Sequence, residues 1–323
     1  RILNDLALLY DYSGKHEAAD SLLNQALGIA RKTKGDKHPD VAVVLNNLGS
    51  LYNDMGLFAK AEPVILEALE IKRKFYGEDH VENVPVFNIL ATLYSDMGKC
   101  EKDEHYYLEA IPIKKKQSGE NNPAYSNYIN NLALLYHLMG YYKKAEPLFL
   151  QSFEIRERLL GENHPLLAQS LNNLAALYSD LAQFEKAEKL YLQAAEIRKV
   201  SLGEGHADYG ASINNLANNY EGMGMPEKAE PLLLLARSIY EKALGKGHPN
   251  YIKVSNNLAS MYAILGQYQK AEELCLNSLE LRKKILGVKH PDYASSLNRL
   301  ALIYKDTWQY EKAEPLYIQA VEL

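Results

Sequence analysis

Histidine recurs along this sequence at a fixed interval, and histidine is the commonest side-chain ligand of protein-bound metals. Six histidines are spaced by 42 residues, or by twice 42 residues: His38, His80, His164, His206, His248 and His290. A zinc site needs ligands that converge to about 2 Å from one ion, whereas neighbouring packed helices lie about 10 Å apart. One histidine per repeated unit therefore builds no metal centre. We expect these residues to shape a turn and the entry into a helix, and no metal site is predicted.

The other candidates for catalysis lack the partners that catalysis needs. His105 and His137 have no evident nucleophile beside them, and nothing near Cys100 supplies an oxyanion hole. The sequence has no phosphate-binding loop, no dinucleotide-binding glycine motif and no His-Glu-x-x-His motif. It therefore predicts a protein that is not an enzyme, with no catalytic residue and no cofactor.

Asparagine occupies one position in all eight copies of the same 42-residue spacing. This central column consists of Asn4, Asn46, Asn88, Asn130, Asn172, Asn214, Asn256 and Asn298. A neighbouring column is mostly asparagine, at Asn47, Asn131, Asn173, Asn215 and Asn257. An amide side chain offers both hydrogen-bond donors and acceptors, so these columns can hold either a ligand or an adjacent part of the protein.

The bulk composition excludes several classes of function. The 323 residues carry a formal net charge of −5 and are 47% hydrophobic and 24% charged, as ordinary globular proteins are. Binding to nucleic acid or to an anionic membrane needs a concentrated basic face, which this balance does not supply. No run of about 18 apolar residues is present, so no membrane helix is predicted. Cys100 and Cys275 are too few for a disulfide framework, which favours a cytoplasmic location.

The asparagine column is one part of a repeat that runs through the whole chain. A tyrosine follows each of these asparagines six residues later, from Tyr10 to Tyr304, without one insertion or deletion. A period sustained over eight copies means stacked supersecondary units. We therefore expect one domain over residues 1–323, with units at approximately 1–37, 38–79, 80–121, 122–163, 164–205, 206–247, 248–289 and 290–323. Both ends look truncated, so a longer protein is expected.

Each unit is predicted to be a pair of helices. In the second unit the first helix is expected from Asp40 to Met55, directly after Pro39, and the second helix from Phe58 to Phe75. Small residues recur at one position in each helix, which predicts close approach of the two helices. The tyrosines are expected in the core with the phenol end in water. No strand pattern is present.

These features resemble the tetratricopeptide repeat. The resemblance lies in the leucine, small residue and tyrosine of the first helix and the alanine, aromatic residue and alanine of the second, as in Leu174, Ala175, Tyr178, Ala187, Tyr191 and Ala194. The 42-residue unit and the turn Gly161-Glu162-Asn163-His164-Pro165 are similar to the kinesin light chain subfamily, in its bacterial type. The resemblance implies an all-α, right-handed α-α superhelix (a solenoid) of about eight helical hairpins that acts as a protein–protein interaction scaffold.

In this family the first helices line a concave groove, so the resemblance places the central column on that groove. The implied peptide-binding residues are Asn46, Asn88, Asn130, Asn172, Asn214, Asn256, Asn298, Asn127, Gln169, His137 and Lys253. Two interpretations of the asparagines stay open: contact with the backbone of an extended peptide, and hydrogen bonds to the adjacent hairpin that set the stacking angle. The groove positions hold few cations and several carboxylates, among them Asp54 and Asp96. A neutral or weakly basic peptide is therefore expected.

The expected partner is a protein or a peptide, with no nucleic acid and no membrane. The alternative function is a regulatory, sensor or spacer arm of a larger protein, whose effector domain (a protease, nuclease or signalling ATPase) lies outside the chain. Uncapped apolar ends also predict self-association.

Two departures from the repeat have alternative interpretations. In the third unit, Asp103 stands in a small-residue column and His105 lies close by, which predicts a hinge, an ion pair with a cation, or simple drift. Trp308 replaces a turn glycine in the last unit, where it is expected either to anchor a partner or to pack locally.

Overall fold

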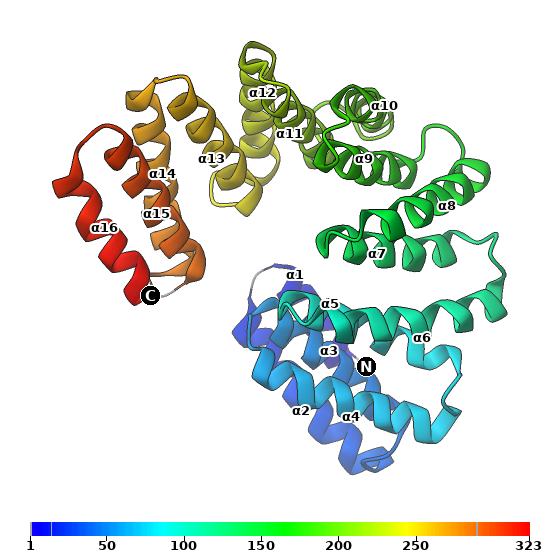
Figure 1. The fold of residues 1–323 in the computed structure, drawn as a ribbon. Helices are drawn as coiled ribbons and strands as arrows, with labels where there is room; N and C mark the ends of the chain where they lie inside the picture. The colour runs from blue at the N-terminus through cyan, green and yellow to red at the C-terminus, as the bar shows by residue number, and fades with distance from the viewer. Residues whose placement is uncertain (1, 14, 289) are drawn as a thin grey trace. The chain divides into compact units, whose positions relative to one another are not determined.

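The structure is a computed structural model that describes residues 2–13, 15–288 and 290–323. These residues form sixteen α-helices and one 3-10 helix, and no strand occurs among them. Consecutive helices pair into hairpins that follow one another in chain order (Figure 1). The predicted all-α repeat of helical hairpins is confirmed. In the second unit the helices start and end within one residue of the expected positions.

The chain divides into two compact units, Arg1–Leu159 and Leu160–Leu323, which we call the N-half and the C-half. The N-half holds α1 (Ile2–Tyr12), α2 (His16–Lys34), α3 (Pro39–Asp54), α4 (Phe58–Tyr76), η1 (Val81–Asn83), α5 (Val84–Asp96), α6 (Cys100–Ser118), α7 (Pro123–Leu138) and α8 (Tyr142–Leu160) up to its last residue. The C-half holds α9 (Pro165–Asp180), α10 (Phe184–Leu202), α11 (Ala207–Gly222), α12 (Pro226–Leu244), α13 (Pro249–Ile264), α14 (Tyr268–Leu286), α15 (Pro291–Asp306) and α16 (Tyr310–Glu322). A single domain over residues 1–323 stays a prediction, and each half is described by itself.

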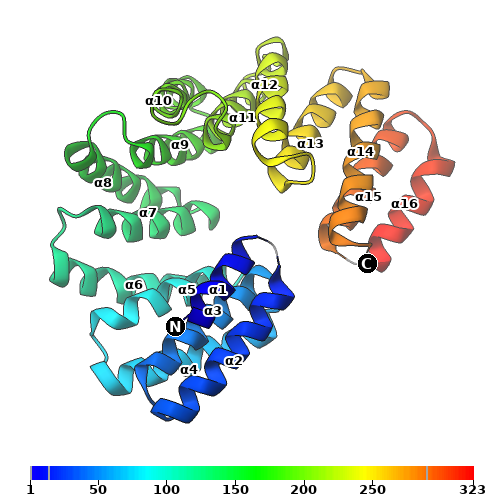
Figure 2. The ribbon, with the colours of Figure 1, turned by 180° about the vertical axis from the view of Figure 1, so that it is seen from behind.

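First helices of successive hairpins touch one another directly. In the N-half α3 contacts α1 and α5, and in the C-half α11 contacts α9 and α13. The second helices α2, α4, α6, α10, α12 and α14 each pack between the first helix of their own hairpin and that of the next, as α4 does between α3 and α5 (Figure 2 gives the same helices from behind). We call the surface that the first helices of one half present the first-helix face; its helices are in direct contact from α1 to α5 and from α9 to α13.

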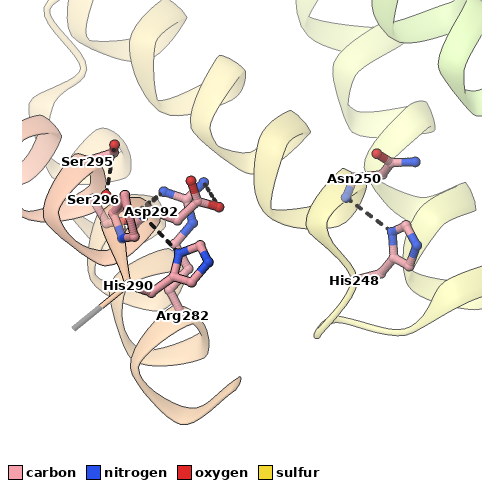
Figure 3. Close-up of polar contacts among 8 residues, drawn as sticks. His248, Asn250, Arg282, His290, Asp292, Ser295 and Ser296 are labelled. Carbon is pink, nitrogen blue, oxygen red and sulfur yellow. Dashed lines mark hydrogen bonds and ion pairs between the residues drawn. The ribbon is translucent and has the colours of Figure 1, made fainter. Parts of the chain in front are cut away.

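The recurring histidines begin the first helices. The Nδ1 atom of His248 accepts a hydrogen bond from the backbone N–H of Asn250 at 3.2 Å, and His290 accepts from Asp292 at 3.1 Å (Figure 3). His38, His80, His164 and His206 make the same contact in their turns. An N-cap acceptor satisfies a backbone donor that the helix itself leaves without a partner. The predicted turn role of these histidines is confirmed.

Small residues let the two helices of a hairpin approach closely, as the repeat predicts. Ala61 is fully buried, and a Cβ atom added to Gly49 would lie 2.1 Å from Cγ1 of Ile65. Such a distance is far below van der Waals contact, so the packing of α3 against Ile65 of α4 requires glycine there.

Within each half, a three-residue contact joins successive hairpins, and we call it the tyrosine clasp. The Tyr94 hydroxyl of α5 donates to Oε1 of Glu62 of α4 at 2.7 Å. Nζ of Lys102 of α6 lies 4.7 Å from the Tyr94 ring centroid and 3.4 Å from the same Glu62 oxygen. The hydroxyl bond recurs in Tyr52–Asp20, Tyr136–Glu104, Tyr220–Glu188, Tyr262–Glu230 and Tyr304–Glu272. Phenylalanine would lack this bond, so the clasp favours tyrosine at this repeat position.

Asp103 is buried in α6 at a position where α4 and α8 carry Ala61 and Ala145. The side chain is 1% exposed, and α5 and α6 remain packed against each other. Burial raises the pKa of the Asp103 carboxyl to about 7; a hydrogen bond with Ser95 opposes this rise, and the Asp96 carboxylate adds to it. Asp103 has no ion pair with any described residue, so the cation partner considered from the sequence is not found.

Replacing Asp103 with alanine should stabilise the chain in a pH-dependent way. The native pKa is raised above the unfolded one, so the wild type loses stability as pH rises from about 4 to about 7. We expect Asp103→Ala to gain about 1–2 kcal/mol at pH 8 and much less at pH 4, measured by urea unfolding. Asp103→Asn should also lose the pH dependence. Equal gains at both pH values would contradict this account.

Replacing Tyr94 with phenylalanine should weaken one clasp. The hydrogen bond from Tyr94, helped by Lys102, lowers the pKa of Glu62, so its contribution is present above the unfolded carboxyl pKa and is lost as pH falls through the native one. We expect a loss of about 1–2 kcal/mol in unfolding free energy at pH 7 and a smaller loss at pH 3. Tyr293→Phe is the matched control: Tyr293 is buried and no hydrogen bond of its hydroxyl is found in the described part of the chain, so this change should be near neutral.

Candidate functional site

The central asparagine column is mostly buried. Asn130, Asn172, Asn214 and Asn256 are 1%, 5%, 5% and 7% exposed. Asn46 and Asn88 are half-buried, and Asn298 is exposed. The amides at the middle of the array are therefore enclosed between hairpins.

Amide side chains tie neighbouring hairpins together where their partners are described. Nδ2 of Asn172 donates to Oγ of Ser212 in the next hairpin at 2.9 Å. Nδ2 of Asn257, in the neighbouring column, donates to Oδ1 of Asn214 at 3.1 Å and to Oδ1 of Asn218 at 3.0 Å. In the N-half, Asn47 donates to Asn4 in the same way at 2.8 Å. These bonds support the stacking interpretation, while peptide contact by the same amides stays a prediction.

Three of the predicted peptide-binding residues are exposed and lie beside the buried column. Asn127, Gln169 and Lys253 occupy the same position of their first helices, and all three are exposed. Oδ1 of Asn127 accepts from Nη2 of Arg156 at 2.7 Å. His137 is half-buried, with its ring centroid 5.8 Å from that of Tyr142 and 6.3 Å from that of Phe149.

A column of cations in the second helices braces the start of the following first helix. Arg198 donates through Nη1 to the backbone oxygen of Asp208 at 2.9 Å and to Oγ of Ser212 at 3.0 Å. Arg282 makes the equivalent bonds to Asp292 and Ser296, at 2.7 and 2.8 Å (Figure 3). Lys72 and Arg156 occupy the same position in the N-half, where both are buried. Burial lowers the pKa of Arg156 to about 10.

Tyr240 replaces the cation of this column in the C-half, and a polar pocket lies beside it. The pocket, of about 210 Å³, is lined by Ala211, Asn214, Asn215, Tyr240, Asn250, Lys253 and Val254. Gly210 lies against this part of α12: a Cβ atom there would be 3.1 Å from Cγ2 of Ile239 and 3.4 Å from Cε1 of Tyr240. The pocket thus brings Asn214 and Lys253 together, and Lys253 has no ion pair with the described residues. The sequence analysis did not identify Tyr240 or Asn250. Tyr240 could have been found because it stands where the equivalent positions of most other second helices hold lysine or arginine.

Carboxylates outnumber free cations on the first-helix faces. Asp54, Asp96 and Asp306 are exposed. Glu221 is half-buried, and burial raises the pKa of its carboxyl to about 7, so it carries only part of its charge near neutral pH. Arg299 donates to the backbone oxygen of Asn256 at 3.4 Å and to Oγ of Ser260, which holds its guanidinium against α13.

No group of three or more His, Cys, Asp or Glu side chains is placed to hold a metal ion within the described residues. Cys100 and Cys275 are free thiols, and burial raises the pKa of Cys275 to about 11. Of the described helices, none combines the length and the apolar content that crossing a bilayer requires.

Trp308 lies in the turn between α15 and α16 with φ of 61°, and most equivalent turn positions hold glycine. The indole is 79% exposed and contacts Tyr310 edge-on, with 6.0 Å between ring centroids. A left-handed backbone costs a non-glycine residue roughly 1 kcal/mol. Local packing against Tyr310 therefore covers only one edge of the indole, and the rest of the ring is open.

A family model described as tetratricopeptide repeat matches residues 1–64, 40–116, 124–199, 182–242, 208–273 and 250–323. A comparison with curated proteins finds no match. Among solved structures, the chain is similar to BtubC (BKLC) from P. vanneervenii, at 26% identity and a TM-score of 0.59, over 69% of this chain and 90% of that one. It is also similar to a putative kinesin light chain with nearly identical TPR-like repeats from Podosopora anserina, at 24% identity and a TM-score of 0.54, over 64% and 97%.

A third similar structure is a Rap protein complexed with competence and sporulation factor, at 13% identity and a TM-score of 0.63, over 99% of this chain and 96% of that one. At such identities the last two structures support the fold alone. The predicted likeness to kinesin light chain-type repeats is confirmed. Because the repeat model matches far more than half of its residues, this chain belongs to the tetratricopeptide repeat family.

Proposed function

We propose that this chain binds an extended segment of a partner protein along its first-helix faces. The tetratricopeptide fold is generally a non-catalytic protein-interaction scaffold. The observation that carries the finer proposal is the exposed polar side chains Gln169 and Lys253 in the C-half and Asn127 in the N-half, which stand at one repeat position beside buried amides. A Rap protein of this fold has been solved complexed with competence and sporulation factor, so the fold can carry a bound factor.

The buried and exposed positions have different roles in this proposal. Asn172 and Asn214 hold successive first helices in register through hydrogen bonds between hairpins. An extended segment advances about 3.3 Å per residue, so it crosses one hairpin, about 10 Å, every three residues. A hairpin that carries an exposed polar residue at this position thus offers it to about one side chain in three of the segment.

The pocket beside Tyr240 gives the segment a fixed point in the C-half. Lys253 and the amides of Asn215 and Asn250 present hydrogen-bond donors around it. A hydrogen-bond acceptor of the segment fits these donors. The partner segment is therefore expected to place a polar acceptor there.

If the chain is instead a regulatory or spacer arm, it should bind no free peptide. Such an arm acts through its effector domain and needs no independent peptide site. Selection of binders from a random extended-peptide library separates the two functions. We expect the wild-type chain to enrich a motif, and Lys253→Ala to bind the selected peptide about tenfold more weakly with unchanged helicity by circular dichroism. If no peptide is enriched by a folded chain, the arm is the better account.

Unfolding free energies should distinguish the asparagines that form hydrogen bonds between hairpins from the exposed polar residues. Asn257→Ala removes bonds to Asn214 and Asn218, so we expect a loss of about 1–2 kcal/mol in urea unfolding at pH 7. Lys253→Ala and Gln169→Ala should change stability by less than about 0.5 kcal/mol, because both side chains are exposed. Equal losses for all three variants would contradict this division of roles.

A further inference from the structure

The histidine that begins α13 caps this helix with an atom that loses the ability in acid. Nδ1 of His248 accepts a hydrogen bond from the backbone N–H of Asn250 at 3.2 Å (Figure 3). In a neutral imidazole one ring nitrogen carries a proton and the other accepts, so this contact requires the neutral ring with its proton on Nε2. Histidine side chains ordinarily take up a second proton between about pH 5 and 8. The protonated ring has donors at both nitrogens, so it cannot accept this bond.

One first helix shows that histidine is not needed for this cap. Asn122 stands at the same repeat position before α7, and its Oδ1 accepts from the backbone N–H of Ala124 at 2.8 Å. An asparagine amide does not titrate, so the cap that it makes does not depend on pH. Asparagine at this position thus keeps the contact without the pH dependence that histidine brings.

A carboxylate beside the ring offsets the loss of the cap at some of the other histidines. Two places after His38 stands Asp40, whose carboxylate lies 3.6 Å from Nδ1 of the ring. Such a carboxylate attracts the protonated ring. Two places after His248 stands Asn250, which carries no charge. The cap at His248 is therefore lost without this compensation.

Other charged groups near the start of α13 do not replace the missing carboxylate. Helices α11, α12 and α14 pack against α13. The charged side chains at the start of α11, in the last turn of α12 and the turn after it, and in the last turn of α14 are Asp208, Glu241, Lys242, Lys246, Lys283 and Lys284. Lys246 pairs with Glu241 at 3.2 Å, and the Asp208 carboxylate lies 3.9 Å from Nδ1 of His206. His248 itself forms no ion pair with the residues that the structure describes.

Asn250 links this cap to the pocket beside Tyr240. Pro249 has no N–H, so the backbone N–H of Asn250 is the first donor of α13, and a donor at this place has no acceptor within the helix. Asn250 also lines the pocket, together with Lys253 and Val254 of the same helix. Loss of the cap, with a positive ring at the helix N-terminus, weakens the first turn of α13. The same change loosens the side of the pocket that Asn250 forms.

We propose that His248 is a pH-dependent switch: its neutral ring holds the start of α13 and the Asn250 side of the pocket, and its protonated ring releases them. The pocket is the fixed point of the partner segment in the proposed function, so the effect of the switch on binding rests on that function. His248 is a positioning residue, which acts through Asn250. Binding of the segment should therefore weaken as pH falls from about 8 to about 5.5.

The first test needs no ligand and compares urea unfolding of the full chain at about pH 8 and about pH 5.5. His248→Asn keeps a cap, so it should match the wild type at the higher pH and have an about fivefold higher ratio of folded to unfolded chain at the lower pH. His248→Ala should lose about fivefold in this ratio at the higher pH. The Glu221 carboxyl, whose pKa burial raises to about 7, titrates in the same range. Every variant keeps Glu221, so the difference between variants removes its contribution.

The second test measures binding by fluorescence anisotropy, with a histidine-free peptide selected from the random library at about pH 8. The wild type should bind this peptide about fivefold more weakly at about pH 5.5. His248→Asn should lose this pH dependence. His290→Asn is the matched control, because His290 caps α15, which contributes no residue to the pocket, and this variant should keep the pH dependence.

The outcomes distinguish the switch from the proposed function. Equal stability of the wild type and His248→Asn at both pH values overturns the switch. A fall in affinity that persists in His248→Asn, or that disappears equally in His290→Asn, also overturns it and leaves the proposed function standing. If the folded chain enriches no peptide, the proposed function is overturned, and the urea comparison alone decides whether His248 is a switch.

Discussion

Everything in this structure depends on how one hairpin is held against the next. The tyrosine clasp makes that contact directional: the acid comes from one hairpin, and the tyrosine and lysine come from the following one. A hydroxyl bound to a carboxylate fixes a distance and an angle, which apolar packing alone does not. The hydroxyl bond repeats at Tyr94 and Tyr136 in the N-half and at Tyr220, Tyr262 and Tyr304 in the C-half. Within each half, successive hairpins are therefore held by the same kind of contact.

The amide columns add a second set of ties on the first-helix face. Asn214 and Asn257 show why a polar residue serves there: each amide can donate and accept, so a bond between hairpins forms without burying charge. The cation column contacts the N-terminal end of first helices, as Arg282 does at Asp292.

Residues that depart from the repeat change the surface of individual hairpins. Tyr240 in the cation column comes with Gly210 and with a pocket that contains Lys253. Asp103 in the alanine column brings a buried carboxyl close to Asp96. Each departure lies in a packing position, yet its consequence reaches the first-helix face. A repeat array can therefore acquire a specific surface by changing residues that a ligand never touches.

The sequence by itself determined the fold class, the hairpin boundaries and the role of the histidines, because period, turn glycine and N-cap residue are local signals that packing does not reverse. It also placed the small residues at the contacts between helices. Only the tertiary structure decided which way each asparagine faces: the sequence treats Asn172 and Asn298 as equivalent, but one is 5% exposed and the other lies open. The clasp partner Glu62 and the pocket beside Tyr240 were likewise decided by the structure. The physical reason is that a side chain's partners across hairpins depend on how far apart the helices stand, and this distance is set jointly by residues tens of positions apart in the chain.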